Sequence, residues 1–199
     1  QSGQFIKTNN MLLKDFENIC RQCNGKVTQF ALGCRGHPDR HENFELILKT
    51  ARENNIVPNY TTSGFLMTEK KAEISKKYCG AVGVSWYRSE YTIKCINMLL
   101  KYNNKVNIHY VLSKSTINEA IELLRFDKFP ANINAVIFLL HKPVGQGKGD
   151  DVLKFNDDRL PLFFKFFEKG HPYKVGLDSC LVPGLFNFGK KVIPESVDT

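Results

Sequence analysis

The feature that most constrains the fold is a regular alternation of short β-rich runs and amphipathic helical segments. The β-rich runs begin near residues 27, 57, 81, 106, 134 and 173, so about 25–30 residues separate most of them. A strand, a helix and two short loops occupy that length. Strict alternation predicts an α/β fold with a parallel sheet and right-handed crossovers, which either lies open or closes into a barrel.

The helical segments carry apolar residues at helix spacing and recognisable start signals. In the segment at residues 10–26, Cys20 is expected in the core and Cys23 at the surface. Thr68 is the expected N-cap of the third helical segment. Thr116 and Glu119 have the spacing of a capping box, in which each side chain bonds the backbone of the other.

The β-rich runs predict a sheet with one apolar and one unusually polar face, because side chains alternate along a strand. An ordinary eight-stranded barrel fills its interior with branched aliphatic residues. We therefore expect an incomplete, wider barrel whose polar lumen holds a ligand, with a solvated sheet face as the alternative. The polar face collects Gln29, Asn59, Thr61, Ser63, Gly83, Ser85, Asn107, His109 and Ser113.

Composition limits the class of protein. The 199 residues, 42% apolar and 24% charged, suit one soluble α/β domain over residues 1–199. The longest apolar run, Ala135–Leu140, is far shorter than the ~18 residues of a membrane span, and no signal peptide is visible, so no membrane partner is expected. The opening Gln1 and the abrupt end predict a processed chain or an excised piece.

Cysteine usage and charge narrow the partners. Six irregularly spaced cysteines are too few for a disulfide scaffold, which predicts a reducing, cytoplasmic location. The net charge of +8 hints at an anionic partner. The lysines lie mostly in short groups on helical stretches, however, so we do not expect a nucleic-acid partner.

Chemistry in such folds gathers at the carboxyl ends of the strands. Those ends are rich in hydroxyl, imidazole, charged and glycine residues, which together describe a pocket for a polar molecule of cofactor size. They are Gly33–Gly36, Thr62–Gly64, Ser85–Arg88, Ser113–Ser115, His141–Pro143 and Asp178–Cys180.

Six motifs follow one another here: FALGCRGHPDRHENFELIL, IVPNYTTSG, YCGAVGVSWYR, NIHYVLSKSTINEAI, NAVIFLLHKPVG and GLDSC. In this order they resemble the middle and later part of a radical S-adenosylmethionine (radical SAM) enzyme, in particular an uncharacterised bacterial group. The resemblance runs from about Gln29 to Ser179. It implies a partial (β/α) TIM-like barrel of parallel strands, open on one side, with its first strand missing from this chain.

The resemblance implies S-adenosylmethionine as a cofactor. In the family, the backbone of a Gly-Gly-Glu-Pro-like loop receives its amino group, and the matching residues are Gly33, Cys34, Arg35, Gly36 and His37. Ser63 and Ser85 fall near the methionyl carboxylate and the ribose, and His109 faces the cofactor or the substrate. The implied substrate pocket consists of His141, Lys142, Asp178 and Cys180.

The chain also departs from the family pattern. Cys34 replaces the second glycine and His37 the acidic residue, and the Cys-x3-Cys-x2-Cys motif of the cluster is absent. We therefore expect the ligands of a [4Fe-4S] cluster outside this chain, and the chain alone to be inactive. The full-length protein is expected to generate a 5′-deoxyadenosyl radical that abstracts hydrogen from a small-molecule or peptide substrate, with an electron donor for the cluster.

Alternative interpretations exist for single motifs. Cys34, His37 and His41 have loose zinc spacing and no obvious fourth ligand, so no metal site is expected in this chain. Cys20 and Cys23 could form a redox pair, but such a motif should follow a strand directly. Residues 144–150, VGQGKGD, could cradle phosphate, yet a flexible loop is favoured because no helix opens directly behind them.

Two alternative functions remain open. One is a cluster-less barrel module with a binding role. The other is a barrel enzyme that binds a phosphorylated metabolite through Lys142, Arg35 and the GQGKG loop. His141 and Lys142 could act as acid and base or form a satisfied pair at the rim.

Overall fold

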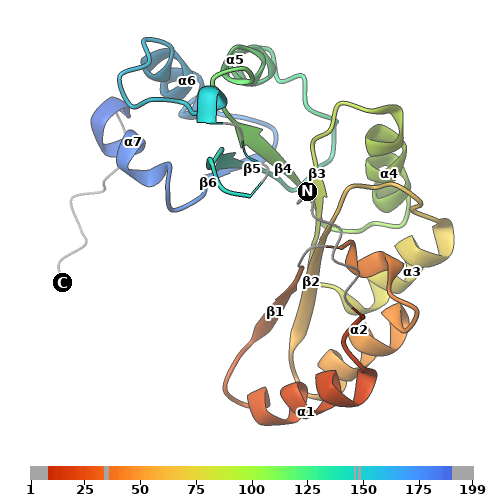
Figure 1. Cartoon of the computed structure of the whole chain (residues 1–199). Coiled ribbons are helices and arrows are strands. Elements are labelled where there is room, and N and C mark those ends of the chain that lie inside the picture. The colour runs from red at the N-terminus through yellow and green to blue at the C-terminus, as the bar shows by residue number, and fades with distance from the viewer. Residues whose placement is uncertain (1–8, 34–35, 146, 148, 190–199) are drawn as a thin grey trace. The chain divides into compact units, whose positions relative to one another are not determined.

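The computed structural model describes residues 9–33, 36–145, 147 and 149–189. Six parallel strands form one open sheet in the order β1-β2-β3-β4-β5-β6, with helices between successive strands (Figure 1). This arrangement confirms the predicted α/β fold with a parallel sheet. The strands are β1 (Gln29–Leu32), β2 (Val57–Thr62), β3 (Val82–Ser85), β4 (Val106–Leu112), β5 (Ala135–Leu140) and β6 (Lys174–Leu177).

Helices α1 to α6 lie in the segments that the sequence pattern predicts as helical, whereas α7, after β6, was not predicted. Thr68 caps α3, because its side chain accepts a hydrogen bond from the Lys71 backbone N–H at 3.3 Å. The helices are α1 (Leu13–Cys23), α2 (Phe44–Glu53), α3 (Glu69–Tyr78), α4 (Glu90–Lys101), α5 (Ile117–Arg125), α6 (Leu160–Phe167) and α7 (Val182–Phe188), with 3₁₀ turns η1 (Pro38–Arg40) and η2 (Gly149–Asp151).

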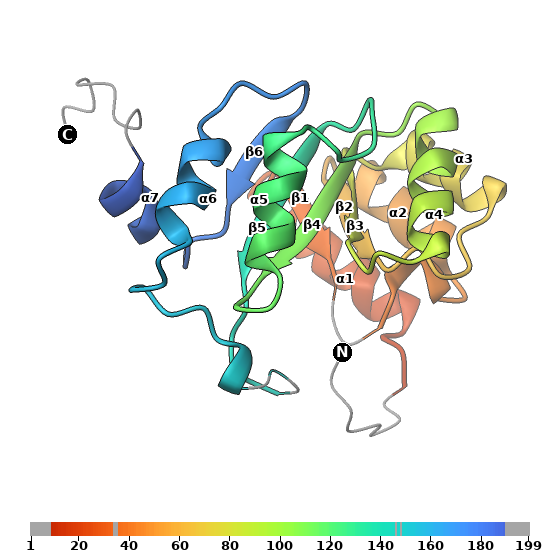
Figure 2. The same cartoon turned by 90° about the horizontal axis from the view of Figure 1, so that it is seen from above.

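The chain divides into two compact units, Gln1–Ile108 and His109–Thr199. In the first unit α2, α3 and α4 lie on one side of β1, β2 and β3 (Figure 2). Phe16 of α1 packs edge-on against Phe30 of β1 with ring centroids 6.2 Å apart, and Cys20 is fully buried beside it. The prediction of Cys20 in the core is confirmed, whereas Cys23 is half-buried and packs against the same cluster.

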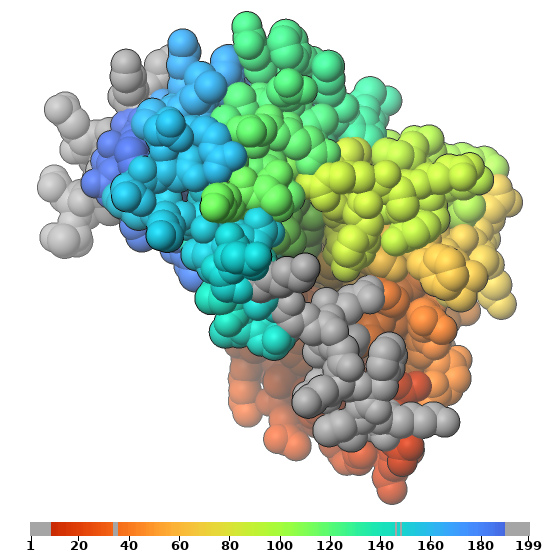
Figure 3. Space-filling view, turned by 45° about the horizontal axis from the view of Figure 1, so that its top comes forward, coloured from red at the N-terminus to blue at the C-terminus, as the bar shows by residue number. Residues whose placement is uncertain are grey.

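The outer faces of the helices carry the charges. Helix α4 reaches the surface in the space-filling view (yellow-green in Figure 3). Its residues Lys94 and Glu90 form an exposed ion pair at 2.5 Å. Such pairs contribute little to stability in high dielectric. Among the described residues, no helix combines the length and the apolar composition that crossing a membrane requires.

The predicted polar face exists in the first unit. Along β2 the buried side chains are Pro58, Tyr60 and Thr62, while the residues between them are half-buried. Asn59 belongs to this second face, and its amide donates to the Gln29 side-chain oxygen at 3.0 Å. The helices therefore cover the apolar face of β2, and a polar ladder runs along the other face.

An aromatic cluster forms the core of the second unit. Phe138 of β5 is fully buried and contacts Tyr110, Phe129 and Phe163 at centroid distances of 5.4, 6.4 and 5.1 Å. The pairs of Phe138 with Phe129 and Phe163 are edge-to-face, and such pairs stabilise by about 1 kcal/mol each beyond the area they bury. The cluster anchors α6 to the strands that carry the candidate pocket residues.

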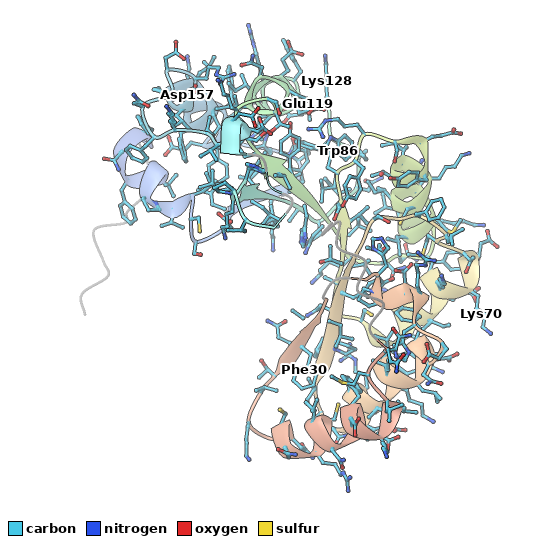
Figure 4. All side chains as sticks on the ribbon, in the orientation of Figure 1. Phe30, Lys70, Trp86, Glu119, Lys128 and Asp157 are labelled. Atoms are coloured by element: carbon cyan, nitrogen blue, oxygen red, sulfur yellow. The ribbon has the colours of Figure 1, made fainter. Side chains whose placement is uncertain are left out.

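The predicted capping box at the start of α5 is wrong. Thr116 makes no side-chain cap; its hydroxyl instead accepts from the Ser113 backbone N–H at 2.8 Å and donates to the Val111 carbonyl. Glu119 (labelled in Figure 4) accepts a 2.6 Å hydrogen bond from the Tyr110 hydroxyl. A buried phenol needs a partner, and this one lies within hydrogen-bond distance of the Thr116 carbonyl (2.8 Å) and of the carboxylate that the local pattern assigned to the cap.

Candidate functional site

The carboxyl edge of the first unit brings together the loops that follow β1 and β2. His37, from the loop after β1, contacts Ser63, from the loop after β2, through its Nε2 at 3.2 Å from the Ser63 Oγ. Twenty-six positions separate the two residues, and Ser63 is buried. Two of the predicted cofactor-binding residues therefore lie in direct contact.

Gly33 and Gly36, in the loop after β1, are exposed. Beside Gly33 and Gly36, no heavy atom of the described residues beyond the chain neighbours lies within 4 Å of the position that a Cβ would take. Glycine allows a ligand to approach the peptide groups closely. Cys34 and Arg35, the other predicted residues of this loop, lie outside the described residues.

The loop after β2 is held rigidly by its own side chains. The Thr62 hydroxyl accepts from the Gly64 N–H at 3.1 Å, and the Ser63 hydroxyl accepts from the Phe65 N–H at 3.3 Å. Gly64 has φ of 84°, and a Cβ there would lie 2.6 Å from the Cβ of Cys95. Only glycine fits this position, so the Ser63 hydroxyl is presented from a fixed turn.

A fully buried carboxylate lies under the same edge. Asp39, in η1, is 1% exposed, and neither of its side-chain oxygens accepts a hydrogen bond in the described part of the chain. The pKa of the Cys95 thiol is raised to about 12, mainly by burial and to a smaller extent by the negative charge of Asp39. The sequence analysis missed Asp39; its place directly after Pro38 in a strand-end loop was the available signal.

Two further predicted cofactor-binding residues lie at the other strands. Ser85 is the last residue of β3 and is half-buried. His109 lies on the half-buried face of β4, and burial lowers the pKa of its imidazole. A neutral imidazole can both donate and accept hydrogen bonds, as recognition of a polar ligand requires.

The second unit uses its predicted pocket residues differently. Asp178, directly after β6, accepts from the Leu140 N–H at 3.2 Å through Oδ2 and from the Leu181 N–H at 3.1 Å through Oδ1. Lys142 forms an ion pair with the same carboxylate at 3.8 Å. Asp178 thus ties β5 to the turn before α7. Cys180 lies exposed in that turn.

His141 continues the ladder of β5, since its backbone N–H donates to the Leu112 carbonyl at 2.8 Å. A Cβ on Gly147 would lie 3.2 Å from the His141 ring and 2.1 Å from the Lys142 carbonyl oxygen, so the loop returns closely over these residues. At the end of this loop, the Asp151 carboxylate accepts hydrogen bonds from the Ser115 N–H at 2.8 Å and from the Ser115 hydroxyl at 3.1 Å.

Phosphate cradling by this loop finds no support. Gln146 and Lys148 lie outside the described residues, and the three residues Gly149–Asp151 form only a 3₁₀ turn. The next α-helix begins at Leu160. A phosphate loop needs a helix N-terminus directly behind it.

The described residues do not fit a metal or a cluster. No group of three His, Cys, Asp or Glu side chains with metal-binding geometry occurs among them. His41 accepts from the Asn43 N–H at Nδ1 (3.0 Å), so its Nε2 donates to the Met11 carbonyl (3.2 Å) and both nitrogens are engaged. Burial raises the pKa of the Cys20 thiol, which disfavours the thiolate that redox chemistry or ligation needs.

Comparison with known proteins gives a clear result for the fold. No family model and no curated protein matches the chain. Among solved structures, anSMEcpe with bound AdoMet (S-adenosylmethionine) and Kp18Cys peptide matches at TM-score 0.65 and 19% identity, over 79% of this chain and 52% of that chain. SuiB of Streptococcus suis bound to precursor peptide SuiA matches at TM-score 0.66 and 21% identity, over 84% of this chain and 43% of that chain.

A further structure of SuiB matches 97% of this chain and 48% of that chain at TM-score 0.67 and 20% identity. The chain thus spans about half the length of these neighbours. The neighbours are radical SAM enzymes. At such low identity the likeness shows the fold alone, and at this level the predicted resemblance is confirmed.

Proposed function

We propose that this chain is the S-adenosylmethionine-binding core of a radical SAM enzyme that acts on a peptide. The observation that carries the proposal is the contact of the glycine loop after β1 with Ser63, at the carboxyl edge of a sheet whose fold matches structures with bound AdoMet. The peptide follows from the same neighbours, two of which hold a peptide.

The first unit offers the kinds of hydrogen-bonding groups that S-adenosylmethionine needs. The open backbone at Gly33 and Gly36 can offer peptide groups to the α-amino and carboxylate groups of the methionyl part. Ser63, already hydrogen-bonded to His37, offers a buried hydroxyl from a fixed turn. When bound beside a reduced cluster, S-adenosylmethionine supplies a 5′-deoxyadenosyl radical in this family.

The cluster itself does not fit the described residues, and we derive no step through it. Its ligands are proposed to lie outside this chain, as is the contact with an electron donor. The proposal for this chain is therefore binding and orientation of the cofactor. The pocket proposed for the peptide is the edge of the second unit, where Asp178 and Lys142 hold the end of β5.

Calorimetric titration of the 199-residue chain with S-adenosylmethionine tests the proposal. We expect saturable binding to the wild type and about tenfold weaker binding to Ser63→Ala, which loses the proposed hydrogen bond to the cofactor and those to His37 and the Phe65 N–H. Ser115→Ala is the matched control, because this hydroxyl is engaged in the second unit by Asp151. A folded wild type that binds no cofactor overturns the proposal.

A further inference from the structure

The buried Asp39 has one charged neighbour in the described chain. The Nζ of Lys71, from the first turn of α3, lies 3.9 Å from Asp39 Oδ2, and the side chains are 24% and 0% exposed. At 3.9 Å the two groups attract each other as charges without a direct hydrogen bond. The pair connects η1, which ends the loop after β1, to the helix that follows the loop after β2.

Lys71 also holds the second loop. Its ammonium donates a 3.1 Å hydrogen bond to the Leu66 carbonyl. Leu66 has φ of 68°, a left-handed conformation, and its side chain is 53% exposed. Among the described residues the other non-glycine positions with positive φ, apart from Arg88, are asparagine or aspartate, which tolerate this region better than leucine. The loop after β2 therefore keeps a costly backbone conformation at the point that Lys71 contacts.

Stability alone does not account for this arrangement. Burying a carboxylate without hydrogen bonds is costly, and an ion pair at this distance recovers only part of the loss. Replacing such a pair by neutral groups of similar size is often neutral or stabilising. Residues that cost stability cluster where a functional geometry has to be held.

We propose that Asp39 and Lys71 form a positioning pair that holds the loops after β1 and β2 together for cofactor binding. The inference rests on the proposed binding of S-adenosylmethionine. Asp39 lies two residues after His37, whose ring contacts Ser63, so the two loops are joined at two points. The first contact joins two predicted cofactor-binding residues, whereas the second joins a buried carboxylate to α3 and would act on the site by positioning the loops.

The test is a double-mutant cycle on the 199-residue chain. Asp39→Asn keeps the shape and removes the charge, and Lys71→Met removes the ammonium while keeping most of the apolar stem. We expect each single variant to weaken S-adenosylmethionine binding about tenfold, and the double variant to be no weaker than either, because the two groups act as one pair. Lys71→Arg, which keeps the charge, should recover most of the affinity.

Lys70→Met is the matched control, because Lys70 directly precedes Lys71 in α3 and points away from the sheet into solvent (Figure 4). The affinity of this variant for S-adenosylmethionine should equal that of the wild type. Thermal unfolding of each variant separates positioning from support of the fold. We expect the unfolding temperature of the double variant to be unchanged or higher while its affinity falls.

Two results would overturn this inference but leave the proposed function in place. One is wild-type affinity in both Asp39→Asn and Lys71→Met, and the other is losses of affinity that add up to about a hundredfold in the double variant. A lower unfolding temperature with unchanged affinity, measured well below unfolding, would assign the pair to the fold and also overturn it. A folded wild type that does not bind the cofactor overturns this inference together with the proposed function.

Discussion

The carboxylates at the carboxyl edges of the two units differ in their hydrogen bonding. In the second unit each oxygen of Asp178 and of Asp151 accepts a hydrogen bond from the chain. In the first unit Asp39 is more deeply buried, yet its oxygens accept none among the described residues. The second edge thus uses its acidic groups to fix its own loops, whereas the first holds a loop geometry at a cost in stability.

The largest expected effect concerns the turn of the first edge. Gly64→Ala should lower the free energy of unfolding by about 3 kcal/mol, because it adds a contact of 2.6 Å with Cys95 to a backbone strained at φ 84°. Gly145→Ala is the control in the second unit. Its φ is 63°, but no atom lies within 4 Å of the added Cβ among the described residues, so a loss of about 1 kcal/mol is expected. Urea unfolding measures both, and equal losses would contradict the close packing at Gly64.

The second-largest effect is expected at Asp178, whose carboxylate links β5 to the turn before α7. Asp178→Ala should destabilise the protein by about 2 kcal/mol, because the N–H groups of Leu140 and Leu181 lose the side-chain acceptor, although the Leu181 N–H keeps the backbone carbonyl of residue 178 at 3.0 Å. Asp150→Ala, an exposed position, should change stability by less than about 0.5 kcal/mol. Faster hydrogen exchange at the Leu181 amide would locate the loss, and wild-type stability in Asp178→Ala would contradict the structural role.

A pH effect is expected in the second unit. Hydrogen bonds from Lys169 (2.6 Å) and His171 (2.6 Å) hold the pKa of Asp127 below its usual value of 3.8. A carboxylate with a lowered pKa stabilises the fold above its unfolded-state pKa, and this contribution is lost as the pH falls through the folded value.

The advantage of the wild type over Asp127→Asn should therefore be constant near neutral pH and shrink below about pH 4. Unfolding free energies of the two proteins from about pH 6 to about pH 2.5 measure it. A difference in unfolding free energy that stays constant over this whole pH range would contradict the stabilising role of the Asp127 carboxylate.

The smallest effect should come from the exposed partner of Asp178. Lys142→Met removes an ion pair of 3.8 Å whose lysine is 53% exposed, so stability should fall by less than about 0.5 kcal/mol. A loss comparable to that of Asp178→Ala, measured under the same conditions, would show that the lysine and not the backbone is the main partner of this carboxylate.

The sequence by itself determined the order of strands and helices as far as β6, the parallel sheet, the cap at Thr68 and the burial of Cys20. These features depend on periodicity and on neighbours within about four residues, which the chain displays directly. The polar face of β2 was predictable for the same reason, since alternation along a strand is local.

Only the tertiary structure decided how the polar groups pair. Glu119, locally a capping residue, bonds Tyr110 nine positions away, and the contact of His37 with Ser63 spans twenty-six positions. The burial of Asp39 beside Lys71 depends on how η1 packs against β2 and α2. Strand-end loops could be identified from the sequence as the place of the site, but a side chain bonds whichever group the packed chain brings within about 3 Å, and no local pattern encodes that choice.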